Sequence, residues 1–263
     1  MRAGCVEVDA PAAGVHRIRI VNPDHRGALS QEVLDGLLRA FADTPPDARC
    51  LLLASCGEAF SAGYDIRALG QPIDVDRAGR AIAPDRVELF DAIERQPLPV
   101  VAALNGAAFG GGLELALACD LRIAARSASL GAPAGRLGLV YSPGGLERLA
   151  RELPAGVMAE LFLAAATVSA ERACALGLVC GVVADDELEG ESVALAAQVA
   201  ELAPSSARAH RAALGALRRA QVGMSDAARE ELGQARLAGL ASPDFAEGIA
   251  AFREHRAPRF GAG

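Results

Sequence analysis

Lysine is absent from this chain of 263 residues, so all 26 basic side chains are arginines. A lysine Schiff base and a phosphate-binding loop that depends on lysine are therefore excluded. The sequence also has no tryptophan and only 4 % aromatic residues, and its formal net charge is -7. A dedicated nucleic-acid-binding surface needs clustered basic and stacking side chains, so none is expected here.

The six cysteines lack the spacing of a metal finger and of a C-x-x-C redox motif, and four of them lie in apolar runs. This pattern is typical of small buried thiols. We therefore expect reduced core cysteines and no metal site. The six are Cys5, Cys50, Cys56, Cys119, Cys174 and Cys180.

Long apolar segments are also missing. Residues 1–14 contain no signal-peptide core, and the uncharged stretch from Gln96 to Leu113 is interrupted by Pro97 and Pro99. A membrane span would tolerate these prolines poorly. We expect a cytoplasmic protein with no membrane partner.

The first half of the chain alternates short β-rich runs with helical patterns, which is typical of a layered α/β fold. Helical spacing covers residues 30–41 and about 84–95, with a mobile-looking segment around 70–79 between them. Strands are predicted at residues 15–21, 50–54, 100–104 and 121–124.

Beyond Ser142, alanine- and leucine-rich segments predict helices, interrupted by one short strand at about 178–183. Ser142 and Ser242 each precede a proline, which places a capping hydroxyl before a proline at the first helical position. We predict an α/β core over residues 1–190 and a helical region over residues 191–263.

Three glycines, Gly110 to Gly112, precede an almost entirely apolar helix. Glycine lets a ligand approach the backbone closely, and the N–H groups of a first helical turn have no partner within the helix. Together with the helix dipole, these groups can hold a developing negative charge. The segment therefore predicts an oxyanion hole.

Glu114 is the only charged side chain between Asn105 and Cys119, and the same helix offers no arginine within reach. A buried carboxyl group in such surroundings should have a raised pKa, which suits it to proton transfer. The alternative is a glutamate that faces solvent or pairs with a distant arginine.

A second segment, residues 58–67, follows the strand at 50–54 and contains a Ser-Ala-Gly turn. Such a turn could supply another backbone N–H donor. On its own, such a turn of small residues is more often purely structural than part of a catalytic loop.

Together, in this order and about 50 residues apart, the two glycine-bearing segments resemble the crotonase (enoyl-CoA hydratase/isomerase) superfamily. Residues 22–30 are similar to its first coenzyme A loop, although Gly27 stands where asparagine is usual. Residues 169–179 and 247–260 are similar to the end of its core and to its C-terminal helices. The resemblance covers nearly the full chain.

The resemblance implies an α/β fold with a core of repeated ββα units and a C-terminal helical region used in trimerisation. It also implies an acyl-CoA substrate, with coenzyme A bound in a bent shape, and a homotrimer or a dimer of trimers. No separate cofactor is expected, because coenzyme A is part of the substrate.

The resemblance assigns the two oxyanion-hole N–H groups to Ala62 and Gly111, and the acid/base role to Glu114. With lysine missing, arginines would have to meet the coenzyme A phosphates. The implied contacts to coenzyme A or the acyl group are His25, Arg26, Ala28, Ser61, Gly63, Tyr64, Asp65, Ile66, Arg67, Gly110, Ala134, Phe252 and Arg256.

Two positions depart from the hydratase pattern. Ala134 stands after Pro133, where a hydratase would carry its second glutamate, and Tyr141 stands where proline is usual. The tyrosine is similar to that of the methylmalonyl-CoA decarboxylase branch, in which it orients the departing carboxylate. Alternatively, Tyr141 packs with its hydroxyl on a backbone carbonyl.

Three hypotheses follow. The favoured one is decarboxylation of a short malonyl-type CoA, which forms an enolate without a base. The second is hydration or isomerisation of an enoyl-CoA by Glu114 alone, although water addition normally uses two acid/base groups. The third is a non-catalytic acyl-CoA-binding or scaffold protein.

Overall fold

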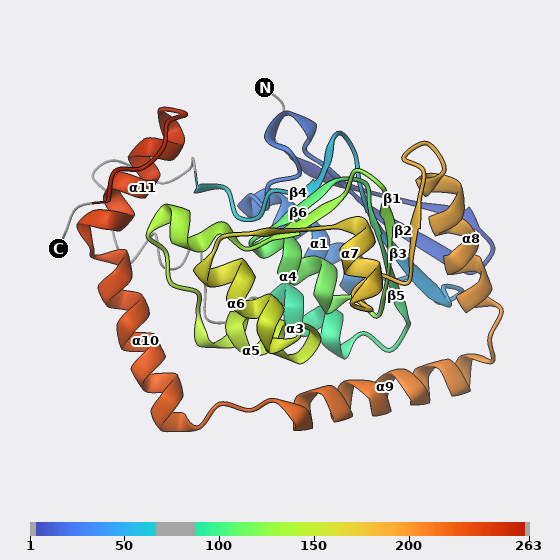
Figure 1. Cartoon of the computed structure of the whole chain (residues 1–263). Helices are drawn as coiled ribbons and strands as arrows, with labels where there is room; N and C mark the ends of the chain where they lie inside the picture. Colours follow the sequence, from blue (N-terminus) through green and yellow to red (C-terminus); the bar gives the residue numbers. More distant parts are fainter. Residues whose placement is uncertain (1–3, 67–87, 261–263) are drawn as a thin grey trace.

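The computed structural model describes residues 4–66 and 88–260. Two β-sheets and the helices that cover them form the core (Figure 1). The segment predicted to be mobile at 70–79, the start of the helix predicted at about 84, and Arg67 all lie outside the described residues.

The larger sheet has six strands in the order β1-β2-β3-β5-β7-β10. β1 and β2 are antiparallel, and the remaining neighbours are parallel. All residues of β5 are buried, as expected of a parallel strand covered on both faces. The strands are β1 (Cys5–Ala12), β2 (Val15–Val21), β3 (Cys50–Ser55), β5 (Val100–Leu104), β7 (Leu121–Ala125) and β10 (Gly181–Val183).

The smaller sheet has the order β4-β6-β8-β9. Each pair β3/β4, β5/β6 and β7/β8 sends its first strand to the larger sheet and its second to the smaller one. Helices α3 (Glu88–Arg95) and α4 (Gly111–Ala118) follow the first two pairs. The repeated ββα core is therefore confirmed. The short strands are β4 (Ala59–Ser61), β6 (Ala107–Phe109), β8 (Ser129–Gly131) and β9 (Thr167–Ser169).

Serine caps start several helices, as predicted. The hydroxyl oxygens of Ser142 and Ser242 accept from the backbone N–H groups of Gly145 and Phe245, each before a proline at the helix start. Ser30 caps the first long helix in the same way. These helices are α1 (Gln31–Ala42), α5 (Pro143–Glu152) and α11 (Pro243–Arg253); α6 (Ala155–Leu163), α7 (Ala170–Ala175) and the 3-10 helices η1 (Pro23–His25) and η3 (Pro133–Leu137) complete the core.

The C-terminal half differs from the prediction in its strands and in the point at which the outer helices begin. The strand predicted at 178–183 is formed only by Gly181–Val183, and β9 is a second strand among the helices. The predicted boundary at residue 190 lies inside α8 (Leu188–Ala200), whose Ala196 and Ala200 join the cluster buried on the larger sheet. The helices that leave the core therefore begin after α8.

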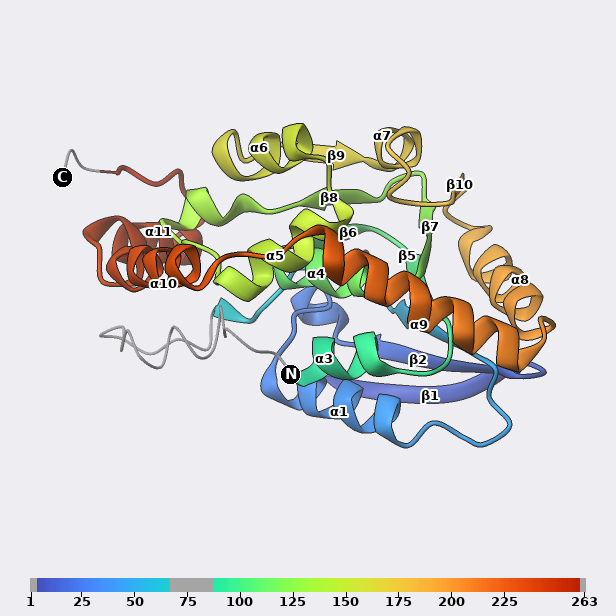
Figure 2. The ribbon, with the colours of Figure 1, turned by 90° about the horizontal axis from the view of Figure 1, so that it is seen from below.

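Helices α9 (Pro204–Gln221) and α10 (Asp226–Leu240) run along the outside of the core as an arm, and α11 turns back toward it (Figures 1 and 2). All of α9 is at least partly exposed. Arg211 ties α9 to the core through Asp120, with 2.6 Å between Nε and Oδ2. In residues 4–66 and 88–260, no helix is both long enough and apolar enough to cross a membrane.

The prediction that all six cysteines are core thiols is wrong. All six are unpaired thiols, but only Cys50 and Cys119 are buried. Cys5, Cys174 and Cys180 are exposed, so their apolar sequence neighbours do not mark core positions. In short helices and edge strands, one face is exposed to solvent even where the local sequence is apolar.

The contact between α11 and η3 predicts opposite effects for two glycine-to-alanine changes. A Cβ at Gly248 would lie 2.5 Å from the backbone of Leu137, whereas one at Gly233 in α10 would meet nothing within 4 Å. We expect Gly248→Ala to lower the free energy of unfolding by about 1–3 kcal/mol through overpacking. Gly233→Ala should raise it by up to about 1 kcal/mol through helix propensity. Chemical denaturation of both variants measures this, and equal effects would contradict the packing of α11 on η3.

Candidate active site

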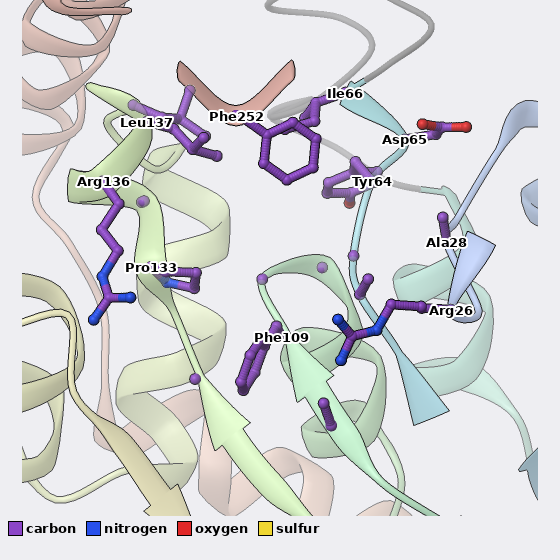
Figure 3. Close-up of a pocket in the computed structure, with 18 of the residues that line it drawn as sticks. Arg26, Ala28, Tyr64, Asp65, Ile66, Phe109, Pro133, Arg136, Leu137 and Phe252 are labelled. Carbon is purple, nitrogen blue, oxygen red and sulfur yellow. The ribbon is translucent and has the colours of Figure 1, made fainter. Parts of the chain in front are cut away.

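A cavity of about 710 Å³ is bounded by loops of both sheets on one side and by η3 and the end of α11 on the other (Figure 3). The loops after β2, β4, β6 and β8 all contribute to its wall. Figure 3 shows Phe252, Leu137 and Ile66 together at one end of it. Predicted site residues that line the cavity are His25, Arg26, Ala28, Ala62, Gly63, Tyr64, Asp65, Ile66, Gly110, Gly111, Glu114, Ala134, Tyr141 and Phe252.

Gly111 is the first residue of α4, and its N–H group has no protein acceptor among the residues that the structure describes. Gly110 precedes it with a φ of 56°, which few other residues adopt. A Cβ on Gly111 would lie 2.8 Å from the ring of Tyr64, so only glycine lets this ring lie so close. Gly111 therefore offers a backbone donor at the cavity wall, as predicted.

Ala62 does not offer the second donor, and this prediction is wrong. Its N–H donates to the carbonyl oxygen of Arg26 at 2.9 Å, and this bond holds the β4 loop to the β2 loop. Two residues later, the N–H of Tyr64 has no acceptor within residues 4–66 and 88–260. Gly63, between them, has a φ of 88°, and a Cβ there would lie 3.0 Å from Gly111 N. The available donor next to Gly111 is therefore Tyr64 N–H.

Ser61 also has a different role from the one predicted. Its side chain is fully buried, outside the cavity wall. The hydroxyl donates to Gly27 O at 2.7 Å and accepts from Gly63 N at 3.2 Å. Ser61 therefore holds the loop that carries Tyr64 and contacts no ligand space.

Glu114 lines the cavity and is only 6 % exposed. Burial raises the pKa of its carboxyl group to about 7, and Arg148 on α5 opposes this shift, with 3.7 Å between Arg148 Nε and Glu114 Oε2. The predicted solvent-facing alternative is wrong, and the distant arginine partner exists. A carboxyl group that titrates near neutrality can either donate or accept a proton.

Tyr141 is 8 % exposed, and its ring packs edge-on against Phe162 at a centroid distance of 4.8 Å. Its buried hydroxyl has no hydrogen-bond partner in the described part of the chain, so the predicted alternative of a bond to a backbone carbonyl is wrong. A Cβ on Gly110 would lie 3.6 Å from this hydroxyl. An unsatisfied buried hydroxyl is unfavourable unless a ligand completes it.

Ala134 lines the cavity and is buried, so it provides no carboxylate there. The acidic side chains of the described cavity wall are Glu114 and, on less buried loops, Asp24 and Asp65. The site thus combines two backbone donors, one buried hydroxyl and one buried carboxyl group. This arrangement can stabilise an oxyanion, bind a second anionic group and move one proton.

Several basic side chains surround the cavity, and the sequence predicted only some of them. Arg26 and His25 are at the wall as expected, but Arg256 is not, because its guanidinium pairs with Glu247 and Glu254. Arg136 and Arg253 line the cavity instead (Figure 3 shows Arg136). Neither stands out among 26 arginines, so the sequence offered no means of selecting them.

Comparison with known proteins is consistent with this site. A family model described as enoyl-CoA hydratase/isomerase matches residues 11–263. The chain is 37 % identical to the mouse (Mus musculus) mitochondrial enoyl-CoA hydratase domain-containing protein 2, over 95 % of this chain and 85 % of that protein. It is 32 % identical to methylmalonyl-CoA decarboxylase of Escherichia coli (strain K12), over 89 % of each.

A solved structure of methylmalonyl-CoA decarboxylase in complex with 2-nitronate-propionyl-CoA has the same fold, with a TM-score of 0.88 and 29 % identity. The superposition covers 98 % of this chain and 99 % of that one. The family match, the sequence relatives and the repeated ββα core agree, so this chain is a member of the enoyl-CoA hydratase/isomerase (crotonase) family of acyl-CoA enzymes.

Proposed function

We propose that this enzyme decarboxylates a short malonyl-type CoA thioester. The observation that carries the proposal is the Tyr141 hydroxyl, which is buried beside the glycine loop and has no partner among the described residues. A substrate carboxylate would complete its hydrogen bonding. The similarity to methylmalonyl-CoA decarboxylase in sequence and fold supports the same reaction.

In the proposed reaction, the thioester oxygen accepts hydrogen bonds from Tyr64 N–H and Gly111 N–H. These fixed donors stabilise the negative charge that grows on this oxygen, each by about 3 kcal/mol. The bond between the α-carbon and the carboxylate breaks, carbon dioxide leaves, and its bonding electrons form the enolate. No base is needed, so Ala134 in place of a second glutamate is compatible with the reaction.

Glu114 then returns a proton to the α-carbon. With a pKa raised to about 7, a substantial fraction of the carboxyl groups is protonated near neutral pH. The cavity wall carries arginines at Arg26, Arg136 and Arg253 that suit the coenzyme A phosphates. No resident cofactor takes part in these steps.

Hydration or isomerisation of an enoyl-CoA is the second candidate. The raised pKa of Glu114 favours it, since such a carboxyl group could serve as the only acid/base. Relatives named as probable enoyl-CoA hydratases also favour it. The single buried carboxyl group weighs against it, because water and the carbon proton would have to share one residue. A non-catalytic acyl-CoA-binding role has no observation in its favour, and turnover of any acyl-CoA would exclude it.

We further propose that the enzyme assembles as a homotrimer or a dimer of trimers. Helix α9 stands outside the core, and its Leu214 and Leu217 are 53 % and 60 % exposed. These two leucines are three residues apart, so they lie on the same face of α9, and a contiguous exposed apolar patch is typical of a surface that a partner covers.

The first prediction from the proposed function concerns Tyr141→Phe. We expect its kcat for methylmalonyl-CoA or malonyl-CoA to fall about 10- to 100-fold, because a hydrogen bond to a charged group contributes about 1.5–3 kcal/mol. The dissociation constant of propionyl-CoA, which has no carboxylate, should stay nearly unchanged. Steady-state kinetics and calorimetric titration measure the two quantities. Unchanged turnover would remove Tyr141 from the proposal.

The second prediction separates decarboxylation from hydration. Wild type should release carbon dioxide from a malonyl-type ester and leave the absorbance of crotonyl-CoA nearly constant. Under the hydratase alternative, that absorbance falls with wild type and not with Glu114→Gln. Mass spectrometry on a panel of malonyl-, methylmalonyl- and enoyl-CoA esters records both reactions, and turnover of any ester ends the binding-protein alternative.

The third prediction concerns assembly. Leu214→Glu together with Leu217→Glu should lower the particle mass in light scattering to that of one chain, 26.9 kDa. A charged pair at Ser205 and Ser206, at the start of the same helix, is the control. A wild-type mass of one chain would contradict the proposed assembly.

A further inference from the structure

Arg148 is a buried arginine on α5 that lies directly behind Glu114, outside the wall of the cavity. Its Nη1 donates to Glu94 Oε1 on α3 at 2.8 Å. Its guanidinium stacks over the ring of Phe90, 4.7 Å from the centroid. An ion pair on one side and a ring on one face hold this guanidinium in place.

One donor of this guanidinium is unused. Arg148 Nε–H is buried and has no hydrogen-bond partner among the described residues. Glu114 Oε2 lies 3.7 Å from Nε, which is too far for a hydrogen bond and close enough for attraction between charges. A buried unpaired donor is costly, and a small rotation of the Glu114 carboxyl group would satisfy it.

We propose that Arg148 is a positioning residue: its unpaired Nε–H receives the Glu114 carboxylate after proton transfer, whereas the protonated carboxyl group stays directed at the cavity. The proton-transfer step in this role depends on the proposed decarboxylation being correct. There, the O–H bond of Glu114 breaks, a C–H bond forms at the enolate α-carbon, and the carboxylate left behind binds Arg148.

The ionisable groups around Glu114 and Arg148 favour a Glu114 carboxyl group that faces the cavity when protonated and turns to Arg148 when ionised. Tyr64 and Tyr141 face Glu114 from the cavity, and both are neutral, since burial raises the pKa of each above its ordinary value. Glu94 faces Arg148 and also lies 3.6 Å from Arg151 Nη1. Arg148 is thus the one cation that an ion pair joins to Glu114 in the described part of the chain.

The other charged side chains of α5 and α3 are paired elsewhere or, in the case of Glu88, exposed. On α5, Glu147 binds Arg229 of α10, and Glu152 lies near Arg122 and Arg218. On α3, Asp91 pairs with the exposed Arg95. The strands β4 and β6 beside α4 contribute no ionisable side chain. Arg148 is therefore the charged side chain that acts directly on Glu114, and Glu94 acts on Glu114 through its ion pair with Arg148.

The signs of two substitutions follow from this arrangement. Arg148→Gln removes the cation that stabilises the carboxylate, so the pKa of Glu114 should rise, with a proton affinity at least about tenfold higher. Glu94→Gln leaves Arg148 uncompensated, so the same pKa should fall, with a proton affinity at least about threefold lower. Arg148→Lys retains the charge and should restore most of the wild-type titration.

Titration of the protein labelled with ¹³C at the glutamate carboxyl carbons, followed by NMR, tests the electrostatic half of the proposal. The resonance missing from Glu114→Gln assigns Glu114. Arg151→Gln is the matched control, because Arg151 contacts Glu94 and not Glu114; its Glu114 titration should stay within about twofold of wild type. Thermal melts check that each variant is folded.

Opposite shifts in Arg148→Gln and Glu94→Gln support the proposal, because a purely structural role would not produce them. An unchanged titration in Arg148→Gln, or shifts of the same sign in both variants, would overturn it.

The kinetic half uses the pH profile of kcat. The basic limb, where Glu114 loses its proton, should move up in Arg148→Gln and down in Glu94→Gln, with KM nearly unchanged because neither side chain lines the cavity. A limb that does not follow the NMR titration would overturn the positioning role. Failure of wild type to decarboxylate any malonyl-type ester would instead refute the proposed function, and the NMR titration would still decide whether Arg148 controls Glu114.

Discussion

The close approach of two backbones at Gly63 and Gly111 is the constraint on which the site depends. A Cβ at Gly63 would lie 2.7 Å from Phe109 O, and one at Gly112 would lie 2.4 Å from Ser61 O. Any side chain there would push the β4 loop away from the start of α4. The donors at Tyr64 and Gly111 are neighbours only because these positions are glycines.

The β4 loop is also held by hydrogen bonds on its side away from the cavity, where it meets the β2 loop. Ser61 Oγ bonds to Gly27 O, and Ala62 N–H bonds to Arg26 O, so the β2 loop holds the β4 loop from the rear. These bonds satisfy the backbone groups that do not face the cavity. The Gly63 N–H donates to Ser61 Oγ, and the following N–H, that of Tyr64, has no acceptor among the described residues. A site that stabilises an oxyanion needs such unpaired backbone donors.

The cavity has few buried polar groups in its wall, and this apolar environment determines the pKa of Glu114. Glu114 lies in an apolar helix, so burial outweighs the attraction of Arg148, and the pKa rises to about 7. The proposed decarboxylase and the hydratase alternative share this carboxyl group and the backbone donors. The two reactions differ in what they need at positions 134 and 141: hydration normally uses a second acid/base group, which Ala134 cannot supply, whereas the proposed decarboxylation uses the Tyr141 hydroxyl. One fold can host several reactions through such changes at single positions.

The sequence by itself determined the strands β2, β3, β5 and β7 of the larger sheet, the serine caps and the glycine-led helix, because apolar periodicity and glycine spacing are local properties. The short strands β4, β6 and β8 of the smaller sheet were not predicted, and the repeated ββα unit came from the family resemblance. It also pointed to Glu114, since a lone acid in an apolar helix is visible in the chain, whereas Tyr141 was selected only through the resemblance to the crotonase superfamily. The tertiary structure decided which amide is available, because the Ala62 N–H is consumed by a carbonyl 36 residues earlier in the sequence, at Arg26. It likewise decided that Arg148 lies behind Glu114 and that Arg256 pairs with Glu247, because contacts between distant segments depend on packing that no local pattern encodes.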